Sequence, residues 1–358
     1  MSATPKDEVL IRREGRAGRI TMNRPQALNA LTHAMVAPIW DALQSWRDDA
    51  GVELVLLDGS GERALCAGGD VRALYDSRGA GSGAARAFWR DEYRLNALIG
   101  RYDKPYVAIQ DGIVMGGGIG LSAHARHRIV TERSRLAMPE TGIGLIPDVG
   151  GSWLLAHAPG EAGLYLGLTG AEMDAADAIY ARFADAFVPS SGLGELKARL
   201  FDPKGGAIGE VLETLTQTPD RSRLAERAAD IDRIFAVDSL EAILFRLEDS
   251  NLDWIDAARR ALTQKSPKAL KLTSAAIRHA RSLASLEAAL DMEFRLAVRL
   301  FEDGEFPEGV RALIVDKDRK PAWSPPRLAD VSDALVRRYL APLPAAEELG
   351  LARVGLQV

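Results

Sequence analysis

The sequence has one cysteine, no excess of basic residues and no long apolar run, and each of these features excludes a class of protein. Cys66 is the single cysteine among 358 residues, which excludes an intramolecular disulfide framework and a cysteine-rich zinc site. The net charge is -5, the pI is near 5.7, and no basic stripe with interleaved aromatic residues occurs. No apolar run approaches the roughly 20 residues that span a bilayer. We therefore expect neither a nucleic acid nor a membrane as partner.

The first residues carry a prediction about localisation. MSATPKDEVL lacks the apolar segment of a signal peptide, and its early acidic residues fit a transit peptide poorly. A single cysteine also suits a reducing compartment. The sequence predicts a cytoplasmic protein, with a processed matrix protein as the alternative.

The first half of the chain alternates strand-like and helix-like segments. Residues 8–15 and 17–23 read as a hairpin, residues 28–46 have helical spacing, and residues 52–61 are an apolar run that ends in a turn. The same alternation continues through a helix at 85–99 and a strand at 105–112. This order predicts an α/β fold with parallel strands and covering helices.

From about residue 200 the sequence becomes helical and amphipathic. Residues 285–304 place apolar side chains three or four positions apart, and Ser266-Pro267 has the form of a helix N-terminus. We expect a core over residues 1–200, a helical C-terminal domain over 201–340 and a tail over 341–358. Residues 201–210, rich in glycine, are expected to link the two domains.

Two glycine-rich segments are candidates for holding a developing negative charge. In the first, Ala67-Gly68-Gly69 follows a short apolar piece, and Asp70 then opens a helix; the second is GIVMGGGIGLSAHA, residues 112–125. Glycines let main-chain N–H groups point outward near a helix start, and two such groups facing one pocket make an oxyanion hole. The alternative for each segment is a tight turn, with Asp70 as an ordinary helix cap.

Other catalytic signatures are missing from the sequence. The spacing in GGGIG does not fit the dinucleotide-binding fingerprint or a phosphate-binding loop, and no serine lies in a nucleophile elbow. Cys66 has no cationic neighbour, and His124 and His127 have no third ligand beside them. Any acid–base chemistry therefore falls to carboxyl groups, and no metal or cofactor is expected.

Glu140 and Asp148, in MPETGIGLIPDVGG, are the strongest candidates for that chemistry. They lie eight residues apart among small and apolar residues. A carboxyl group in such surroundings is expected to have a shifted pKa, which acid–base catalysis uses. The alternative is a pair of solvated loop acids.

Four motifs in order resemble the crotonase (enoyl-CoA hydratase/isomerase) superfamily: NRPQALNAL, CAGGD, QDGIVMGGGIGLS and MPETGIGLIPDVGG. Further segments, including FWRDEYRLN, SPKALKLT, MEFRL and GEFPEGVRALIVDKDRKPAW, are similar to its 3-hydroxyisobutyryl-CoA hydrolase branch. The resemblance implies a crotonase-like spiral of ββα units with a C-terminal helical domain. It also implies an acyl-CoA thioester substrate.

The resemblance assigns roles to individual residues. The oxyanion-hole donors are expected at Gly69 and Gly117, with Gly68 as a one-residue alternative to the first. Glu140 and Asp148 are expected to be catalytic. Further residues expected to line the substrate site are Glu92, Ala67, Gly68 and Asp70; those expected to bind CoA are Arg24, Ala27 and Leu28.

The chain departs from the hydratase pattern at Gly120. Hydratases carry there the first of two glutamates that hold a water molecule, whereas this chain keeps only the second, Glu140, and adds Asp148. This pair fits hydrolysis of 3-hydroxyisobutyryl-CoA in valine degradation. Glu140 either attacks the thioester or activates water, and the sequence leaves both open.

Three questions remain open at this stage. The alternative functions are an enoyl-CoA hydratase or isomerase that uses Glu140 alone, and a silent acyl-CoA-binding or RNA-binding relative. The acyl group is 3-hydroxyisobutyryl or 3-hydroxypropionyl. The assembly is a homo-oligomer, trimeric or hexameric, or a monomer.

Overall fold

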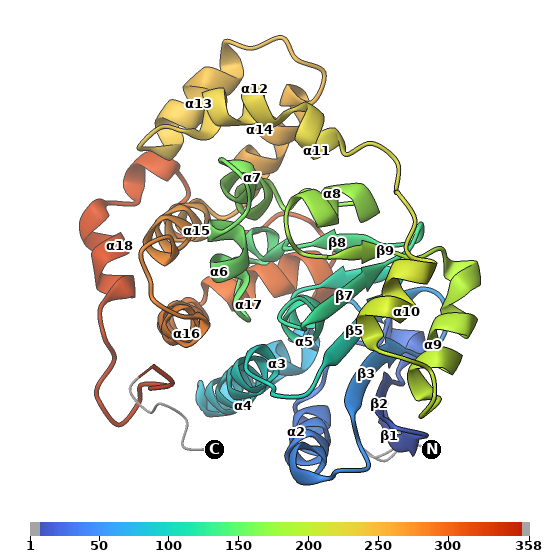
Figure 1. The fold of residues 1–358 in the computed structure, drawn as a ribbon. Helices are drawn as coiled ribbons and strands as arrows, with labels where there is room; N and C mark the ends of the chain where they lie inside the picture. Colours follow the sequence, from blue (N-terminus) through green and yellow to red (C-terminus); the bar gives the residue numbers. More distant parts are fainter. Residues whose placement is uncertain (1–7, 353–358) are drawn as a thin grey trace. The chain divides into compact units, whose positions relative to one another are not determined.

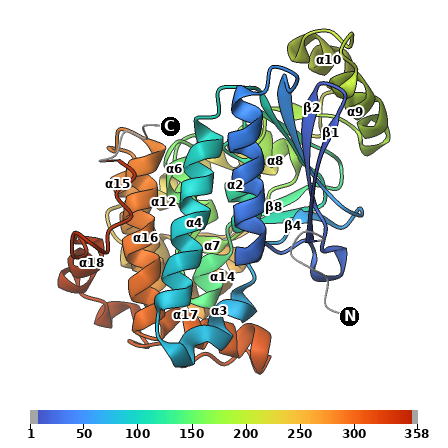
Figure 2. The ribbon, with the colours of Figure 1, turned by 90° about the horizontal axis from the view of Figure 1, so that it is seen from below.

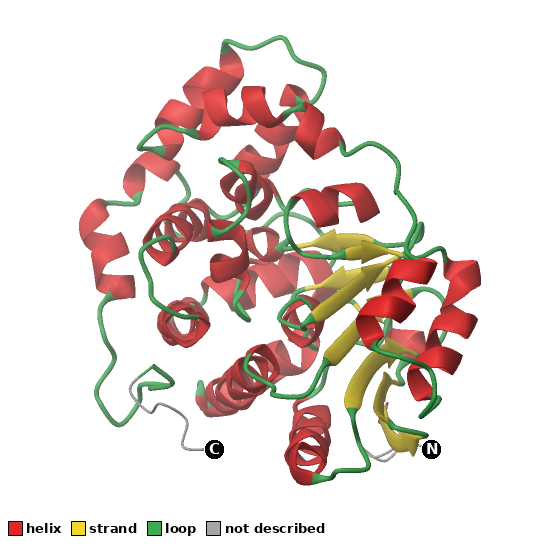
Figure 3. Ribbon diagram, viewed as in Figure 1, coloured by secondary structure: helices red, strands yellow, loops and turns green. Residues whose placement is uncertain are grey.

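The computed structural model describes residues 8–352, and its chain divides into two compact units. Figure 1 follows the chain by colour, and Figure 3 separates its helices from its strands. Each unit is built from three stretches that alternate along the sequence. Unit 1 comprises residues 1–69, 94–136 and 173–225, and unit 2 comprises residues 70–93, 137–172 and 226–358.

The main sheet of unit 1 contains six strands among the described residues, in the order β1-β2-β3-β5-β7-β9. β1 and β2 form the predicted hairpin, and every other neighbouring pair is parallel. The strands are β1 (Val9–Glu14), β2 (Ala17–Met22), β3 (Leu54–Gly59), β5 (Tyr106–Gln110), β7 (His127–Val130) and β9 (Ala186–Phe187).

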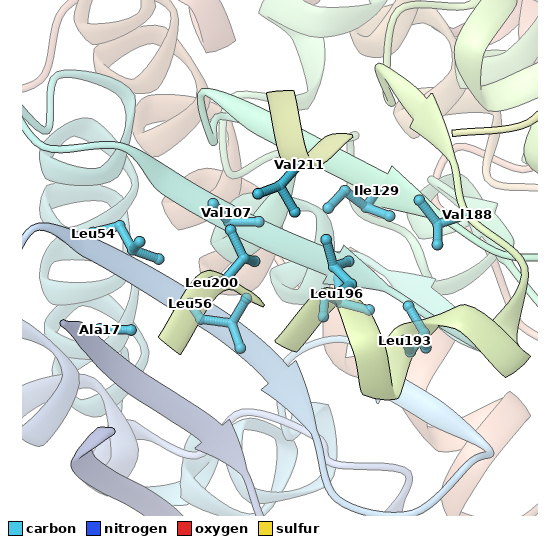
Figure 4. Close-up of a cluster of buried hydrophobic side chains, with 11 residues drawn as sticks. Ala17, Leu54, Leu56, Val107, Ile129, Val188, Leu193, Leu196, Leu200 and Val211 are labelled. Atoms are coloured by element: carbon cyan, nitrogen blue, oxygen red, sulfur yellow. The ribbon is translucent and has the colours of Figure 1, made fainter. Parts of the chain in front are cut away.

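Apolar side chains on one face of this sheet are covered by two helices, α9 (Leu193–Phe201) and α10 (Ile208–Leu215) (Figure 4). Leu196 and Leu200 of α9 and Val211 of α10 pack against Leu56 and Val107 from the strands. Residues 201–210, expected to link two domains, instead connect α9 and α10 within unit 1. The leucine side chains of α9 and the valine side chain of α10 are buried on the same sheet, which keeps both helices in unit 1. The connection between them has the composition of a turn but does not link two domains.

A second sheet of three short strands carries the glycine-rich segments. Its order is β4-β6-β8, with β4 (Ala64–Cys66) parallel to β6 (Ile113–Met115). β8 spans Arg135–Ala137. One residue separates the end of β4 from Gly68-Gly69, and β6 ends directly before Gly116, as expected for strands that turn into helices within a few residues.

The order of elements along the chain repeats a strand–strand–helix pattern. β1 and β2 precede α2 (His33–Asp48), β3 and β4 precede α3 (Val71–Ser77), and β5 and β6 precede α5 (Gly117–Ser122). The first strands of these repeats enter the main sheet and the second strands β4 and β6 enter the small one. The predicted α/β fold built from ββα units is therefore confirmed. In Figure 2, α2 runs along the strands of unit 1.

Unit 2 is helical, and several of its helices lie side by side, including α6, α7 and α15 (Figure 1). Its helices between residues 70 and 172 are α3, most of α4 (Gly83–Gly100), α6 (Gly151–Ala156) and α7 (Ala162–Thr169). Those after residue 226 are α12 (Ala228–Phe235), α13 (Leu240–Glu248), α14 (Ile255–Gln264), α15 (Pro267–Ala280), α16 (Leu286–Glu302), α17 (Glu305–Val310) and α18 (Asp333–Leu340). Among the described residues there are also the short α-helices α8 (Ala175–Tyr180) in unit 1 and α11 (Arg223–Glu226) where the units meet in sequence.

The predicted start of α15 is confirmed in detail. Ser266 is the N-cap, and its hydroxyl accepts a hydrogen bond from the N–H of Ala269 at 2.9 Å, while Pro267 occupies the first helical position. A proline there loses no helical hydrogen bond, because the first N–H groups of a helix have no partner within it. α16 is also capped by a serine, since the hydroxyl of Ser285 accepts a hydrogen bond from the N–H of Ala288 at 3.3 Å.

The units group the chain differently from the consecutive domains 1–200 and 201–340 expected above, and those domain bounds stay a prediction. The last part of the expected tail, residues 353–358, lies outside the described residues. Within residues 8–352, no helix is both long and apolar enough to cross a bilayer.

Candidate active site

Glu140 occupies a buried position at the start of a single helical turn in unit 2. The turn spans Glu140–Ile143 and follows directly after Pro139. Only 5% of Glu140 is exposed, and its Oε2 atom has no hydrogen-bond partner among the described residues. Burial raises the pKa of Glu140 well above its usual range, and the nearby charge of Asp148 raises it further. The prediction of a solvated loop acid is therefore excluded for Glu140.

Asp148 is buried to the same extent and has a defined partner. The hydroxyl of Tyr93 donates a hydrogen bond of 2.6 Å to its Oδ2 atom. Burial raises the pKa of Asp148 to about 6, although the hydrogen bond from Tyr93 acts in the opposite direction. The backbone of the next residue, Val149, is left-handed with a φ of 54°. A β-branched residue rarely adopts this conformation, so the surrounding contacts must hold the turn.

Glu92 and Tyr93 are supplied by α4. Glu92 is 2% exposed, and its Oε1 atom has no hydrogen-bond partner among the described residues. Burial is the main cause that raises the pKa of Glu92 well above its usual range, followed by the charges of Asp148 and Glu140. The three acids that the sequence predicted for the site thus influence one another within unit 2.

A fourth carboxyl group, Glu293 of α16, holds the turn after Asp148. Its two oxygens accept hydrogen bonds from the N–H groups of Gly150, at 2.7 Å, and Ser152, at 2.9 Å, and also from the Ser152 hydroxyl. These bonds fix the backbone directly after the strained Val149. Burial raises the pKa of Glu293 to about 8, against the lowering effect of the hydrogen bonds.

Lys265 brings a positive charge close to these acids. Its Nζ atom donates a hydrogen bond of 2.8 Å to the hydroxyl of Thr141, the residue after Glu140. Burial lowers the pKa of Lys265 to about 8, while attraction to Glu140 acts in the opposite direction. The same attraction lowers the pKa of Glu140.

Tyr93, Glu293 and Lys265 were not predicted from the sequence. Two of them lie in motifs that carried the resemblance, since Tyr93 follows Glu92 in FWRDEYRLN and Glu293 is the acid of MEFRL. Those motifs were a usable signal for both residues. Lys265 precedes SPKALKLT and carries no such signal.

The predicted oxyanion-hole residues, Gly69 and Gly117, lie in two glycine-rich segments of unit 1. A Cβ atom placed on Gly68, whose φ is 117°, would lie 3.5 Å from the carbonyl oxygen of Met115, so the two glycine-rich segments are neighbours. Gly117 is the first residue of α5, and Gly69 pairs with Leu31 in an isolated parallel bridge. Among the described turns and loops, neither the N–H of Gly69 nor that of Gly117 donates a backbone hydrogen bond.

The remaining candidates fall into three environments. Ala27 and Leu28 are half-buried in unit 1, where the carbonyl of Leu28 accepts a hydrogen bond from the N–H of Ala67 in the first glycine segment. The Arg24 guanidinium pairs with Glu8 and donates to the carbonyl of Ala30, so its role in binding CoA stays a prediction. Asp70 caps α3, as its simplest interpretation predicts.

Residues 8–352 contain no group of three or more histidine, cysteine, aspartate or glutamate side chains that could hold a metal ion. Cys66 is fully buried, in agreement with its interpretation as a small buried thiol. The carboxyl groups of Glu92, Glu140 and Asp148, which are buried and have raised pKa values, are the candidate reacting groups of unit 2.

The expectation of a cytoplasmic protein is contradicted by relatives of this chain. A mitochondrial 3-hydroxyisobutyryl-CoA hydrolase from Danio rerio is 40% identical over 351 residues, which is 96% of this chain and 92% of that protein. Other hydrolases at about 40% identity are also named mitochondrial. The first residues of the sequence were therefore a wrong guide to localisation.

Two crystal structures closely match the fold. A carnitinyl-CoA dehydratase from Mycobacterium thermoresistibile has a TM-score of 0.91 and 44% identity, over 96% of this chain and 98% of that chain. An enoyl-CoA hydratase from Rhodobacter sphaeroides 2.4.1 has a TM-score of 0.90 and 45% identity, over 96% and 99%. The sequence profile of the enoyl-CoA hydratase/isomerase family matches residues 17–340. The chain therefore belongs to the enoyl-CoA hydratase/isomerase family, and the predicted resemblance to its 3-hydroxyisobutyryl-CoA hydrolase branch is confirmed.

Proposed function

We propose that this protein is a thioester hydrolase that releases CoA from 3-hydroxyisobutyryl-CoA, a step of valine degradation. One observation carries the proposal: Glu140 and Asp148 lie in one buried group of acids whose pKa values are raised. A buried carboxyl group with a raised pKa is suited to exchange protons near neutral pH. The curated relatives at about 40% identity carry the name of this activity.

The proposed reaction begins with polarisation of the thioester carbonyl. Its oxygen accepts hydrogen bonds from the N–H groups of Gly69 and Gly117, which stabilise the negative charge that develops there. This role of the two amides stays a prediction. That the amides and the carboxyl groups act on the same thioester is a prediction as well.

Glu140 then acts by one of two routes. In the first, its carboxylate attacks the carbonyl carbon, the bond to sulfur breaks, and water hydrolyses the resulting anhydride. In the second, Glu140 takes a proton from water, the resulting hydroxide attacks the carbonyl carbon, and the bond to sulfur breaks as the thiolate leaves and takes up the proton. Both routes yield the carboxylic acid and CoA. Asp148 is assigned to the 3-hydroxyl group of the substrate, with the Tyr93 hydroxyl holding its Oδ2 atom.

A second candidate is hydration of an enoyl-CoA with Glu140 as a single acid–base group. The names of the two matching crystal structures, a dehydratase and a hydratase, favour this reaction. Gly120, where the resemblance places the other hydratase glutamate, opposes it, because glycine cannot transfer a proton. The hydrolase reaction requires no group at that position.

Release of thiol distinguishes the two candidates. The enzyme is mixed with (S)-3-hydroxyisobutyryl-CoA and, separately, with crotonyl-CoA, and free CoA is followed with a thiol-reactive dye. We expect thiol release from the first substrate. Rapid loss of the crotonyl double bond without thiol release would establish hydration and overturn the proposal.

The same assay with 3-hydroxypropionyl-CoA tests the acyl preference, because both substrates carry the 3-hydroxyl group. The proposed substrate is a small acyl-CoA, and no metal or cofactor takes part in the proposed reaction. The assembly, as an oligomer or a monomer, is decided by sedimentation.

A further inference from the structure

The amine of Lys265 is hydrogen-bonded to one residue beside Glu140 and borders the same small space as the other. Its Nζ atom donates to the Thr141 hydroxyl at 2.8 Å. On the other flank, a Cβ atom placed on Gly170 would lie 2.7 Å from Lys265 Nζ and 3.0 Å from Cα of Pro139. One small space, left open by a glycine, thus borders the lysine amine and the backbone just before Glu140.

This amine has little to stabilise its charge. Among the described residues it forms no ion pair, and its hydrogen-bond partner is the neutral hydroxyl of Thr141. Lys265 also lines an apolar cavity of about 190 Å³, together with leucines such as Leu262 and Leu270. A buried ammonium group is costly unless an opposite charge lies nearby.

The negative charge of Glu140 is also poorly stabilised by its surroundings. The charged groups that face it are Asp148 before α6, Glu293 of α16, Glu92 of α4 and Lys265 before α15. Three of these four are acids, which disfavour a negative charge on Glu140. Lys265 is the cation among these four groups. Its attraction to Glu140 lowers the pKa of Glu140 and raises the pKa of Lys265.

We propose that Lys265 is a positioning residue for Glu140 and supplies a positive charge that favours ionisation of this buried carboxyl group. The inference rests on the proposed function, in which Glu140 attacks the thioester or activates water as a carboxylate. Among the described residues no ion pair joins the two groups, and the Oε2 atom of Glu140 has no hydrogen-bond partner, so this oxygen remains free to react. The Thr141 hydroxyl holds the amine, and the absence of a side chain at Gly170 leaves room for it.

The test measures the ionisation of Glu140 directly. Infrared difference spectra between each enzyme and its Glu140→Gln counterpart follow the protonated carboxyl group of Glu140 as pH is varied. Lys265→Met removes the charge at nearly constant length, and we expect the Glu140 titration to move up by about one pH unit. The acidic limb of kcat/KM for thiol release should move with it.

Two variants serve as controls. Lys265→Arg retains a positive charge and should leave the titration close to that of the wild type. Lys271→Met makes the same substitution on α15, where Lys271 pairs with Glu241 at 2.7 Å, and should not alter the titration.

An unchanged titration in Lys265→Met overturns the inference, as does a shift in Lys265→Arg as large as that in Lys265→Met. If Lys265→Met does not fold, Thr141→Val removes the anchoring hydroxyl at constant shape, and an unchanged Glu140 titration in that variant also overturns it. The infrared measurement needs no turnover. If the wild type releases no thiol, the proposed function fails while the titration still decides the role of Lys265.

Discussion

Burial governs the chemistry of the individual carboxyl groups. Glu92, Glu140, Asp148 and Glu293 are each at most 5% exposed and have raised pKa values. Raised pKa values of this kind mark groups that can exchange protons near neutral pH. The four differ in their hydrogen bonding. Glu293 accepts three hydrogen bonds and Asp148 accepts one from Tyr93, whereas Glu140 and Glu92 each have an oxygen without a partner in the described part of the chain.

Glu140→Gln is expected to lower kcat for thiol release at least about 100-fold, the scale of a lost acid–base group. Glutamine has nearly the same shape, and removing a buried ionisable group does not cost stability, so urea unfolding should change little. Glu132→Gln is the matched control, because Glu132 is a surface acid that pairs with Ser190 in unit 1. A Glu140→Gln rate near that of the wild type would remove Glu140 from the reaction.

Tyr93→Phe is expected to raise the pKa of Asp148. The substitution removes the hydroxyl that donates to Asp148 Oδ2 and changes nothing else in shape. A hydrogen bond to a charged group contributes about 1.5–3 kcal/mol, so a shift of about one pH unit or more is expected. Infrared titration of Asp148, with Asp148→Asn as reference, measures this shift.

The matched control is Tyr106→Phe. Tyr106 is equally buried, but its hydroxyl has no hydrogen-bond partner among the described residues. If both phenylalanine variants give the same Asp148 titration as the wild type, the hydroxyl of Tyr93 does not influence the carboxyl group.

The candidate site was predictable only in part from single residues. Glu140 and Asp148 stand out in the sequence because charged residues are rare among small and apolar ones. Tyr93, by contrast, is an ordinary aromatic residue of an amphipathic helix, and its hydrogen bond joins residues 55 positions apart. No local pattern reports such a long-range contact.

At the scale of elements, close approach of α5 to β4 places the second glycine segment. A Cβ atom on Gly118 would lie 2.2 Å from the carbonyl oxygen of Cys66. This neighbour is backbone and cannot rotate away. Glycine at this position therefore lets α5 start directly beside the strand, which fixes the N–H of Gly117.

Gly118→Ala is expected to displace the start of α5. Overpacking of this kind costs about 1–3 kcal/mol of unfolding free energy, and a displaced oxyanion donor lowers kcat by about 100-fold. Urea unfolding and the thiol-release assay measure the two effects. Gly194→Ala on α9 is the control, because a Cβ atom there meets no other atom within 4 Å. Wild-type kcat in Gly118→Ala would show that the exact position of α5 does not matter.

Elements were predictable where local patterns decide them. β3 is an apolar run with both faces buried, and α15 has a serine cap followed by proline. For residues 201–210, the glycine and proline residues correctly indicate a turn. They do not indicate whether the turn connects two helices of one unit or two domains. Packing of Leu200 and Val211 on the same sheet decided that question.

At the scale of the whole chain, the order of the sequence does not show which segments belong to the same compact unit. Residues 70–93 and 137–172 come from the predicted core, yet they belong to the same unit as the C-terminal helices. Glu92, Glu140 and Asp148 therefore share unit 2 with Glu293 and Lys265. A domain boundary at residue 200 would separate Glu140 from Glu293 and Lys265, whose charges influence it. The amphipathic patterns of the helices do not indicate which helix faces pack together.

The group of buried acids in unit 2 also predicts how stability depends on pH. A carboxyl group whose pKa is raised by folding stabilises the protein fully below its unfolded pKa, and this contribution is lost as pH rises through the folded pKa. For Glu293 the window runs from 4.5 to about 8, and for Asp148 from 3.8 to about 6. The unfolding free energy should therefore fall as pH rises from about 5.5 to about 7.5.

Glu293→Gln isolates the contribution of one of these groups. One titrating group contributes up to about 1.4 kcal/mol per pH unit, so the variant should show a slope shallower by up to that amount in urea unfolding. The lost hydrogen bonds to Gly150 and Ser152 lower stability at every pH and leave the slope unaffected. Glu302→Gln, on the same helix, is the control, because the pKa of Glu302 is lowered and its contribution lies below this pH range. Equal slopes in all three proteins would mean that Glu293 is already ionised at pH 5.5.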